Sequence, residues 1–204
     1  DVKGQKLGSV SGPCDAEEVA LERLSYLTIA AQDESKAQVV ADCLACDFIK
    51  TKLSNDIYGT EFGAVLKNIY AIAAGIAHGL GYGDNFQAVL MSNAIREMNY
   101  ILKTASPMKR KINDSAYLGD LLVTGYSFFS RNRMFGNMIG KGYTVKSAIL
   151  EMNMVAEGYY ATKGVAIMNE QYQIKAPIIN AVHKILYEDK NAKKTFEKLS
   201  KKLD

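Results

Sequence analysis

Cysteine and histidine are scarce in this sequence. Its 204 residues include only three cysteines and two histidines. A small, odd number of cysteines argues against a disulfide-stapled scaffold and favours a reducing, cytoplasmic setting. Cys43 and Cys46 form a C-x-x-C pair, but a zinc site would need a second pair or nearby histidines, and His78 and His183 lie far away in the sequence. We therefore expect no metal site.

Long apolar runs and a large charge of one sign are also missing. No stretch approaches the roughly 20 apolar residues that cross a bilayer, and no signal-peptide pattern is present. The net charge of +3 is too small to indicate nucleic acid binding by itself. Lysines do gather at the C-terminus, and because Glu197 and Asp204 interrupt them we interpret them as a solvated helix face rather than a binding patch. These lysines are Lys190, Lys193, Lys194, Lys198, Lys201 and Lys202.

What is present is an ordinary globular composition, with 48% hydrophobic and 23% charged residues. Residues 25–31 form a β-prone run, Asp33 is suited to cap a helix over 34–45, and residues 48–53 alternate as a half-buried strand does. This order predicts one β-α-β unit. One such unit is too little sheet to stand alone, and Asp1 is not an initiator, so we expect the chain to be cut from a longer protein.

From residue 58 onward, helical periodicity replaces the strand signal. Predicted helices cover 58–80, 85–103, 145–152, 157–170, 177–188 and 191–202. Their starts carry suitable residues: Asp84 or Asn85, Thr144 and Asn191 as caps, and Pro177 at a first helical position. The predicted fold class is therefore mainly α, with an α/β remnant over 1–57 and an all-α domain over 58–204.

The helix over 58–80 carries an unusual lysine. Its apolar stripe consists of Phe62, Val65, Leu66, Ile69, Ala73 and Ile76. The opposite side holds small residues around Lys67, namely Gly63, Ala64, Ala71, Ala74 and Gly75. A helix that is apolar nearly all round is a buried one, so we expect Lys67 to be partly desolvated, with a pKa lowered toward neutrality. That suits a general acid/base, although a lysine that reaches solvent at the helix edge is an open alternative.

A second polar segment lies among glycines between Leu118 and Gly136. It contains Asp120, Thr124, Ser130, Arg131, Asn132 and Arg133. Two guanidinium groups beside a serine and an asparagine are typical of an anion site, because guanidinium pairs with phosphate through two hydrogen bonds. The equally good alternative is a helix start with surface arginines. The glycines at 79–83 and 136–142 lack the context of a dinucleotide loop and of a phosphate-binding loop, respectively.

Several runs, in this order, resemble the NAD(P)-dependent glycerol-3-phosphate dehydrogenases of the bacterial type. They are Ser11-Gly-Pro13, Ala16 to Ala20, Gly59 to Asn68, Ala71 to Ala77, Gly79 to Asn85, Gly119-Asp120, Ser130-Arg-Asn-Arg133, Val155 to Gly158 and Pro177 to Glu188. The resemblance implies a Rossmann-like nucleotide-binding domain, of which 1–57 would be the end, followed by a helical substrate-binding domain. It implies interconversion of sn-glycerol 3-phosphate and dihydroxyacetone phosphate with NAD or NADP, which supplies glycerophospholipid synthesis.

The resemblance also implies site residues. Lys67 matches the family's proton acceptor. Expected substrate contacts are Gly12, Cys14, Lys67, Asn68, Asp120, Ser130, Arg131 and Asn132, and expected cofactor contacts are Ala16, Arg131, Val155 and Glu157. Cys14 stands where many members have Ser or Asn, which weakens the expected hydrogen bond there. The oligomeric state stays open, although a homodimer is common in the family, and the chain without its upstream nucleotide loop is expected to be inactive.

Two other classes of function stay open at this point. One is a related two-domain dehydrogenase that acts on a different hydroxy acid or on a sugar. The other is a non-enzymatic helical interaction module, in which the small residues around Lys67 would pack on a partner protein. Activity that depends on the substrate phosphate would favour glycerol-3-phosphate dehydrogenase over the first alternative. A Lys67 substitution that leaves the function intact would favour the interaction module.

Overall fold

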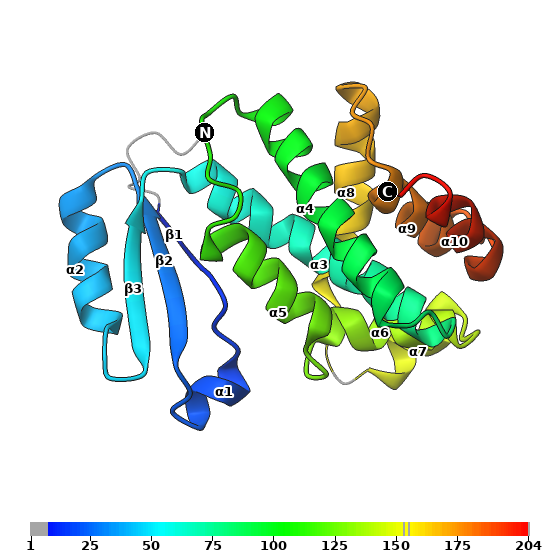
Figure 1. The fold of residues 1–204 in the computed structure, drawn as a ribbon, viewed down its shortest axis with the longest axis horizontal. Coiled ribbons are helices and arrows are strands. Elements are labelled where there is room, and N and C mark those ends of the chain that lie inside the picture. Colours follow the sequence, from blue (N-terminus) through cyan, green and yellow to red (C-terminus); the bar gives the residue numbers. More distant parts are fainter. Residues whose placement is uncertain (1–7, 153, 155, 204) are drawn as a thin grey trace. The chain divides into compact units, whose positions relative to one another are not determined.

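A three-stranded sheet opens the fold, and helices make up the rest of the chain (Figure 1). The computed structural model describes residues 8–152, 154 and 156–203. The first elements are β1 (Gly8–Ser11), α1 (Ala16–Ala20), β2 (Ser25–Ala31), α2 (Glu34–Leu44) and β3 (Ile49–Ser54). β1 is antiparallel to β2, and β2 is parallel to β3. The predicted β-α-β unit is thus confirmed as β2, α2 and β3.

Helix α2 covers this sheet through a small apolar core. The Asp33 side chain accepts a hydrogen bond from the Ser35 backbone N–H and so caps α2, as the sequence predicts. Ala37 and Ala41 lie on one face of α2 and pack with Ile29 of β2, joined by the partly buried Leu53 of β3. The short alanine side chains allow the helix to lie close to the strands.

β1 escaped the sequence analysis, which placed the first strand at Ser25. Its residues reverse the usual pattern, because Ser9 and Ser11 are buried while Val10 is 51% exposed. The Ser9 hydroxyl donates a 3.0 Å hydrogen bond to the Glu61 carboxylate, which makes its burial tolerable. A strand that buries polar residues gives no alternation of apolar side chains by which it could be recognised.

The helical part confirms all six predicted helices and adds others. The longer ones are α3 (Ile57–Gly79), α4 (Asp84–Ala105), α6 (Arg131–Gly140), α8 (Glu157–Gln171) and α9 (Pro177–Tyr187). The shorter ones are a π-helical turn η1 (Ser115–Gly119), α5 (Asp120–Tyr126), α7 (Val145–Glu151) and α10 (Ala192–Ser200). The structure therefore confirms a mainly α fold class with a small α/β part at its start. No helix in the described part of the chain is long and apolar enough to cross a membrane.

Among the caps predicted for the helices after residue 58, two are right and one is wrong. Thr144 and Asn191 accept hydrogen bonds from the backbone N–H groups of Ser147 and Lys194, three residues further on. In α4, by contrast, Asp84 is already the first helical residue, and the cap position is taken by Gly83, which has no side chain to offer.

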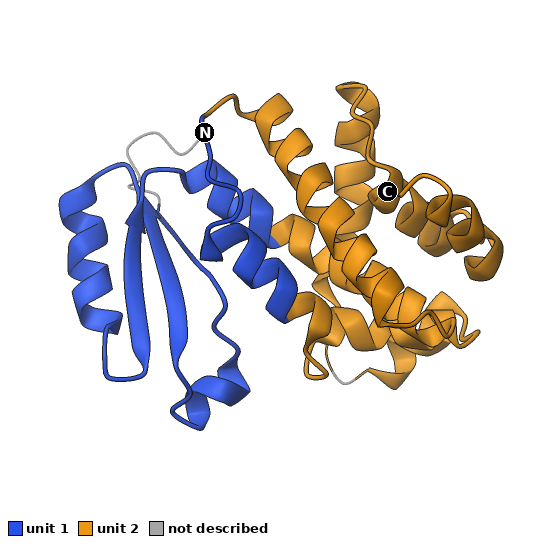
Figure 2. Ribbon diagram, in the orientation of Figure 1, with its two compact units in different colours: residues 1–64, 109–123 blue, residues 65–108, 124–204 orange. Residues whose placement is uncertain are grey.

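The chain forms two compact units that interleave in the sequence (Figure 2). Unit 1 comprises residues 1–64 and 109–123, and unit 2 comprises residues 65–108 and 124–204. Unit 1 holds the sheet together with η1, and unit 2 holds most of the helices. The predicted domain boundary between residues 57 and 58 stays a prediction.

The part of α3 that belongs to unit 2 is deeply buried. Its residues from 69 to 77 are all buried, as expected for a helix that is apolar nearly all round. α6 packs so tightly on α3 that a methyl group on Gly136 would collide with the Ile72 carbonyl oxygen and come within 3.0 Å of the Ile76 nitrogen. The glycines at 136–140 thus serve helix packing, in agreement with their rejection as a phosphate loop.

Candidate functional site

Three helices bring most of the predicted site residues of unit 2 together. Lys67 and Asn68 lie on α3, Arg131 and Asn132 begin α6, and Glu157 begins α8. The Asn68 side-chain amide donates a 3.4 Å hydrogen bond to the Glu157 carboxylate. The buried Asn132 side-chain oxygen accepts one of 2.8 Å from the backbone N–H of Gly158. These contacts connect the three helices at one place.

Two helix N-termini therefore meet at this cluster. Ser130 caps α6 by accepting a hydrogen bond from the Arg133 backbone N–H. α8 starts at Glu157 without a side-chain cap, and the Asn132 side-chain oxygen accepts from the backbone N–H of Gly158 in its first turn. Because helix N-termini carry partial positive charge and unpaired N–H groups, this arrangement favours an anion.

The two arginines of the Ser-Arg-Asn-Arg run have different environments. Arg133 lies 4.7 Å from the centre of the Phe128 ring, burial lowers its pKa, and its buried Nε has no hydrogen-bond partner within the described residues. Arg131 makes one weak contact, 3.4 Å from its Nη1 to the sulfur of Met154. Arg131 is thus the arginine whose planar set of donors can turn to a ligand.

Lys67 is partly exposed, next to Asn68 on α3. The small residues on this side of α3 let another backbone come close toward the C-terminal end of the helix. A methyl group on Gly75 would collide with the Arg133 carbonyl oxygen of α6. Lys67 lies about two helical turns before Gly75, about 12 Å along the axis, and directly before Asn68, which joins the three-helix cluster.

Unit 1 holds a second group of predicted site residues, namely Gly12, Cys14 and Asp120. Gly12 has φ +139°, and a methyl group there would lie 2.5 Å from the Tyr26 carbonyl oxygen, so only glycine fits. Gly119 approaches Pro13, with 3.5 Å between the Pro13 ring and the position that a Cβ would take. The segment from Gly12 to Cys14 therefore lies against the start of α5.

Burial and charge at this group affect the Cys14 thiol. Asp120 is only 2% exposed, at the first position of α5. Burial raises the pKa of Cys14, a hydrogen bond with Ser25 opposes the rise, and the negative charge of Asp120 adds to it. Cys14 is therefore a neutral thiol near pH 7, able to form only weak hydrogen bonds.

The two remaining predicted cofactor contacts are less defined. Ala16 is the exposed first residue of α1, after its cap Asp15. Val155 lies outside the described residues. Cys43 and Cys46 are exposed free thiols, and within the described residues no group of three His, Cys, Asp or Glu could hold a metal ion.

Sequence reasoning missed a buried ion-pair cluster in unit 1. The Asp56 carboxylate accepts hydrogen bonds from Arg110 at 2.5 and 3.0 Å, from the Tyr117 hydroxyl at 2.5 Å and from the Gly59 backbone N–H at 2.9 Å. Burial alone would raise the pKa of Asp56, but these hydrogen bonds outweigh burial and lower it. Tyr117 belongs to η1, directly before Asp120, so the cluster fixes the backbone that presents Asp120. The position of Asp56 just before α3 was the one available signal.

A second buried acid, Glu97, was also missed. From α4 its carboxylate accepts hydrogen bonds from the backbone N–H groups of Ile178 at 2.8 Å and Ile179 at 3.1 Å, in the first turn of α9. Burial raises the pKa of Glu97 to about 7, although these two N–H groups and the nearby Tyr70 hydroxyl oppose the rise. No local pattern marks this residue, because it lies on an ordinary amphipathic helix.

Comparison with known proteins places this geometry in a family. The model of the C-terminal part of NAD-dependent glycerol-3-phosphate dehydrogenase matches residues 56–197. The chain belongs to this family. The matched range includes Lys67, the Ser-Arg-Asn-Arg run and the start of α8.

Relatives of the family cover nearly the whole chain. A protein of Staphylococcus haemolyticus named glycerol-3-phosphate dehydrogenase [NAD(P)+] is 36% identical over 95% of this chain and 58% of its own length. One of Agathobacter rectalis with the same name is 38% identical over 92% of this chain and 56% of its own length. The chain thus spans somewhat more than half the length of these relatives.

Solved structures agree with the family assignment. The crystal structure of glycerol-3-phosphate dehydrogenase from Coxiella burnetii superposes with a TM-score of 0.92 at 30% identity, over 96% of this chain and 61% of that one. The yeast enzyme from Saccharomyces cerevisiae superposes with a TM-score of 0.85 at 24% identity, which shows the same fold.

Proposed function

We propose that the protein containing this chain is an NAD(P)-dependent glycerol-3-phosphate dehydrogenase. It interconverts sn-glycerol 3-phosphate and dihydroxyacetone phosphate in the cytoplasm and supplies glycerophospholipid synthesis. The carrying observation is the junction at which Asn68 of α3 bonds to Glu157 of α8 and Asn132 of α6 bonds to Gly158 of α8, with Lys67 and Arg131 next to Asn68 and Asn132 in the sequence. The names of relatives at 36% and 38% identity support the same activity, and the three free cysteines are compatible with a reducing compartment.

The anion-favouring cluster is suited to the substrate phosphate. Arg131 offers a planar set of donors, and the first turns of α6 and α8 add partial positive charge. The Asn132 side-chain oxygen accepts a hydrogen bond from Gly158, so its amide N–H groups can donate to an anion. Binding the phosphate here holds the reacting carbon in a fixed place, so that remote binding energy is used for orientation.

Lys67 is the proposed general base. Oxidation of the secondary alcohol requires removal of the hydroxyl proton while a hydride leaves carbon, and the nicotinamide, when bound, accepts that hydride. The Lys67 amine takes the hydroxyl proton and returns it to the carbonyl oxygen in the reverse direction. Asn68, the next residue on α3, is proposed to contact the substrate while Glu157 orients its amide.

The other site residues complete the proposal. Gly12, Cys14 and Asp120 in unit 1 and Ser130 in unit 2 are proposed substrate contacts. Arg131, Ala16, Val155 and Glu157 are proposed contacts of NAD or NADP. The exposed Glu157 carboxylate and the Arg131 guanidinium fit such a cofactor, because they offer an acceptor for hydroxyl groups and donors for amide or phosphate oxygens. A homodimer is also proposed.

Replacing Lys67 tests the catalytic assignment. In the full-length enzyme, Lys67→Ala is expected to lower kcat by about 10²–10⁴-fold, the usual effect of losing a general acid/base. Lys163→Ala is the matched control, because Lys163 is an exposed lysine of α8 outside the cluster, and it should leave kcat unchanged. A Lys67→Ala enzyme that retains more than about a tenth of the wild-type kcat would show that Lys67 is not the base.

A further inference from the structure

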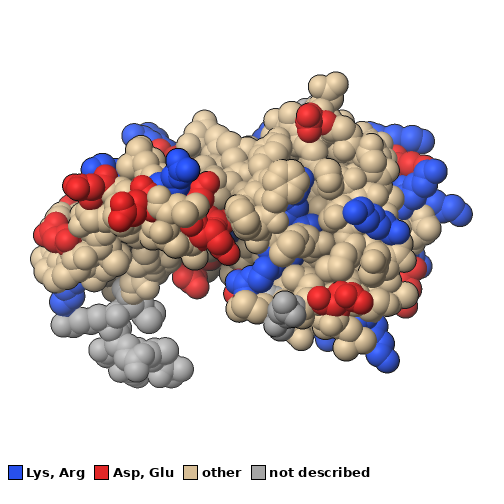
Figure 3. All heavy atoms as spheres, turned by 90° about the horizontal axis from the view of Figure 1, so that it is seen from below, with Lys and Arg blue, Asp and Glu red and all other residues tan. Residues whose placement is uncertain are grey.

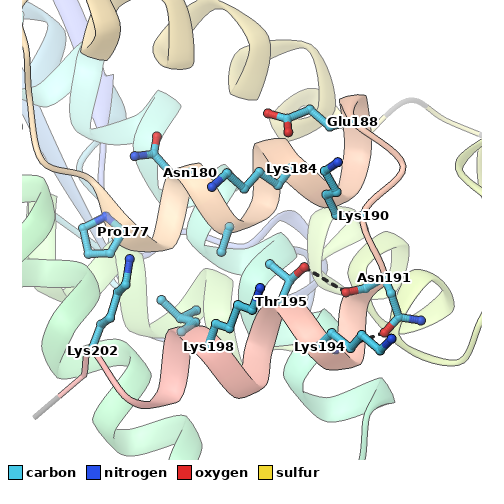
Figure 4. A pocket seen from close by; sticks show the side chains of 12 residues that line it. Pro177, Asn180, Lys184, Glu188, Lys190, Asn191, Lys194, Thr195, Lys198 and Lys202 are labelled. Carbon is cyan, nitrogen blue, oxygen red and sulfur yellow. Dashed lines mark hydrogen bonds between the residues drawn. The ribbon is translucent and has the colours of Figure 1, made fainter.

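A groove between α9 and α10 is bordered by five lysines and shares no lining residue with those proposed for catalysis. It has a volume of about 430 Å³ and lies entirely within unit 2. Figure 4 shows the lysines on the two helices and on the adjoining turns. They are Lys184, Lys190, Lys194, Lys198 and Lys202. One carboxylate, Glu188, shares the groove, so its lining carries a net charge of about +4.

Among the residues that the structure describes, acidic groups leave these five lysines without an ion pair. Glu188 lies 3.4 Å from the imidazole of His183 rather than at a lysine. Asp189 and Glu197 are close in sequence but do not line the groove. No ion pair joins any of the five lysines to a carboxylate among the described residues. On the face drawn in Figure 3, basic side chains gather over the helical unit, while acidic ones are commoner over unit 1.

The lysines are arranged as a row and an opposite wall. Lys194 and Lys198 are four residues apart on α10, about 6 Å along its axis, and Lys202 follows in the next turn. Lys184 on α9 and Lys190 in the linker border the other side. α10 is held in place because its Phe196 and Leu199 are buried, and Leu199 also lines the groove. Neutral donors also line the groove, among them the exposed Asn180 amide.

We propose that this groove binds a small soluble anion that carries two or more phosphate groups. Like charges held together on two rigid helices repel one another, and a polyvalent anion removes that repulsion while its groups reach several lysines at once. One phosphate group reaches only neighbouring lysines, whereas a chain of phosphates can follow the row. A concave groove of this volume is in the range of small-molecule sites, which favours a soluble anion over a flat membrane surface. The site revises the interpretation of these lysines as a solvated face, and it stands independently of the proposed dehydrogenase activity.

Calorimetric titration of this chain with inorganic tripolyphosphate and with orthophosphate tests the proposal. At matched ionic strength, tripolyphosphate should bind at least about tenfold more tightly than orthophosphate, because it can pair with more lysines at once. The affinity should fall as salt is raised, since exposed ion pairs are screened. Failure of tripolyphosphate to bind, or equal affinity for both probes, would overturn the proposal.

Paired substitutions distinguish a site from diffuse attraction. Lys194→Gln with Lys198→Gln should weaken tripolyphosphate binding by about tenfold, since two ion pairs are lost. The control pair, Lys193→Gln with Lys201→Gln, removes the same charge from the same stretch outside the groove and should change the affinity less than about twofold. Equal weakening by both pairs would mean that only net charge matters. Lys194→Arg with Lys198→Arg keeps the charges and should keep binding; loss of binding there would contradict the proposal.

A second arm separates a soluble anion from a lipid surface. Sedimentation with phosphatidylcholine vesicles, with and without phosphatidylserine, measures membrane attachment. The proposal expects tripolyphosphate to bind and to release any chain attached to the anionic vesicles. Attachment to anionic vesicles without measurable tripolyphosphate binding would assign the lysines to a membrane surface instead.

Discussion

Replacing Gly136 by alanine should separate α6 from α3 and destabilise unit 2. The new methyl group would collide with the Ile72 carbonyl oxygen and would lie 2.9 Å from the Ile72 carbonyl carbon and 3.0 Å from the Ile76 nitrogen. All three atoms belong to the backbone of a buried helix, so no side chain can turn aside. Overpacking of a core costs typically about 1–3 kcal/mol, and a backbone obstacle favours the upper end.

An opposing effect must be subtracted from this cost. Alanine stabilises a helix interior by about 1 kcal/mol relative to glycine. The net loss for Gly136→Ala is therefore about 2 kcal/mol of unfolding free energy. In a chain of 204 residues this corresponds to a fall in Tm of about 4–8 °C.

Gly164 provides the matched control within the same unit. It lies in the middle of α8, and a methyl group there meets no described atom within 4 Å. Gly164→Ala should therefore raise the stability by up to about 1 kcal/mol through helix propensity alone. Thermal and urea unfolding of both variants, followed by circular dichroism, would measure the difference. If both substitutions stabilise the chain, close backbone packing between α3 and α6 is wrong.

Three further predictions concern Glu97, Arg131 and Cys14. Burial raises the pKa of Glu97 in the folded chain from 4.5 to about 7, so its contribution to stability is fully present below about pH 4.5 and is lost as the pH rises to about 7. Glu97→Gln should remove this part of the fall in Tm with pH. A variant whose Tm depends on pH as the wild type does would contradict the assignment. In the full-length enzyme, Arg131→Ala should lower kcat/KM by about tenfold or more for the phosphorylated substrate and change it little for glycerol, because a charge-assisted hydrogen bond to phosphate is lost. Equal decreases in kcat/KM for both substrates would exclude the phosphate role. Iodoacetamide should modify Cys14 more slowly at pH 7.5 than the exposed Cys43 and Cys46, since burial raises its pKa; equal rates, read by mass spectrometry, would contradict this.

Local signals in the sequence determined much of the secondary structure. Asp33, Thr144 and Asn191 cap the helices that they were predicted to cap, because a cap bonds to a backbone group only two or three residues away. The burial of α3 could also be predicted locally, because apolar residues occupy nearly every side of the helix in each successive turn. Caps and helix burial depend on residues close together in the sequence, so the sequence alone predicts them.

Only the tertiary structure decided which distant residues meet. Asp56 is 54 residues from Arg110 and 61 from Tyr117, and nothing near Asp56 in the sequence indicates either partner. The spacing of the lysines on α10 predicted a solvated helix face. Only the packing of α10 beside α9 in the folded chain placed Lys184 opposite them. Periodicity and caps fix how each segment folds on itself, whereas the surroundings of a charge depend on which other segment packs against it, and that is a property of the whole chain.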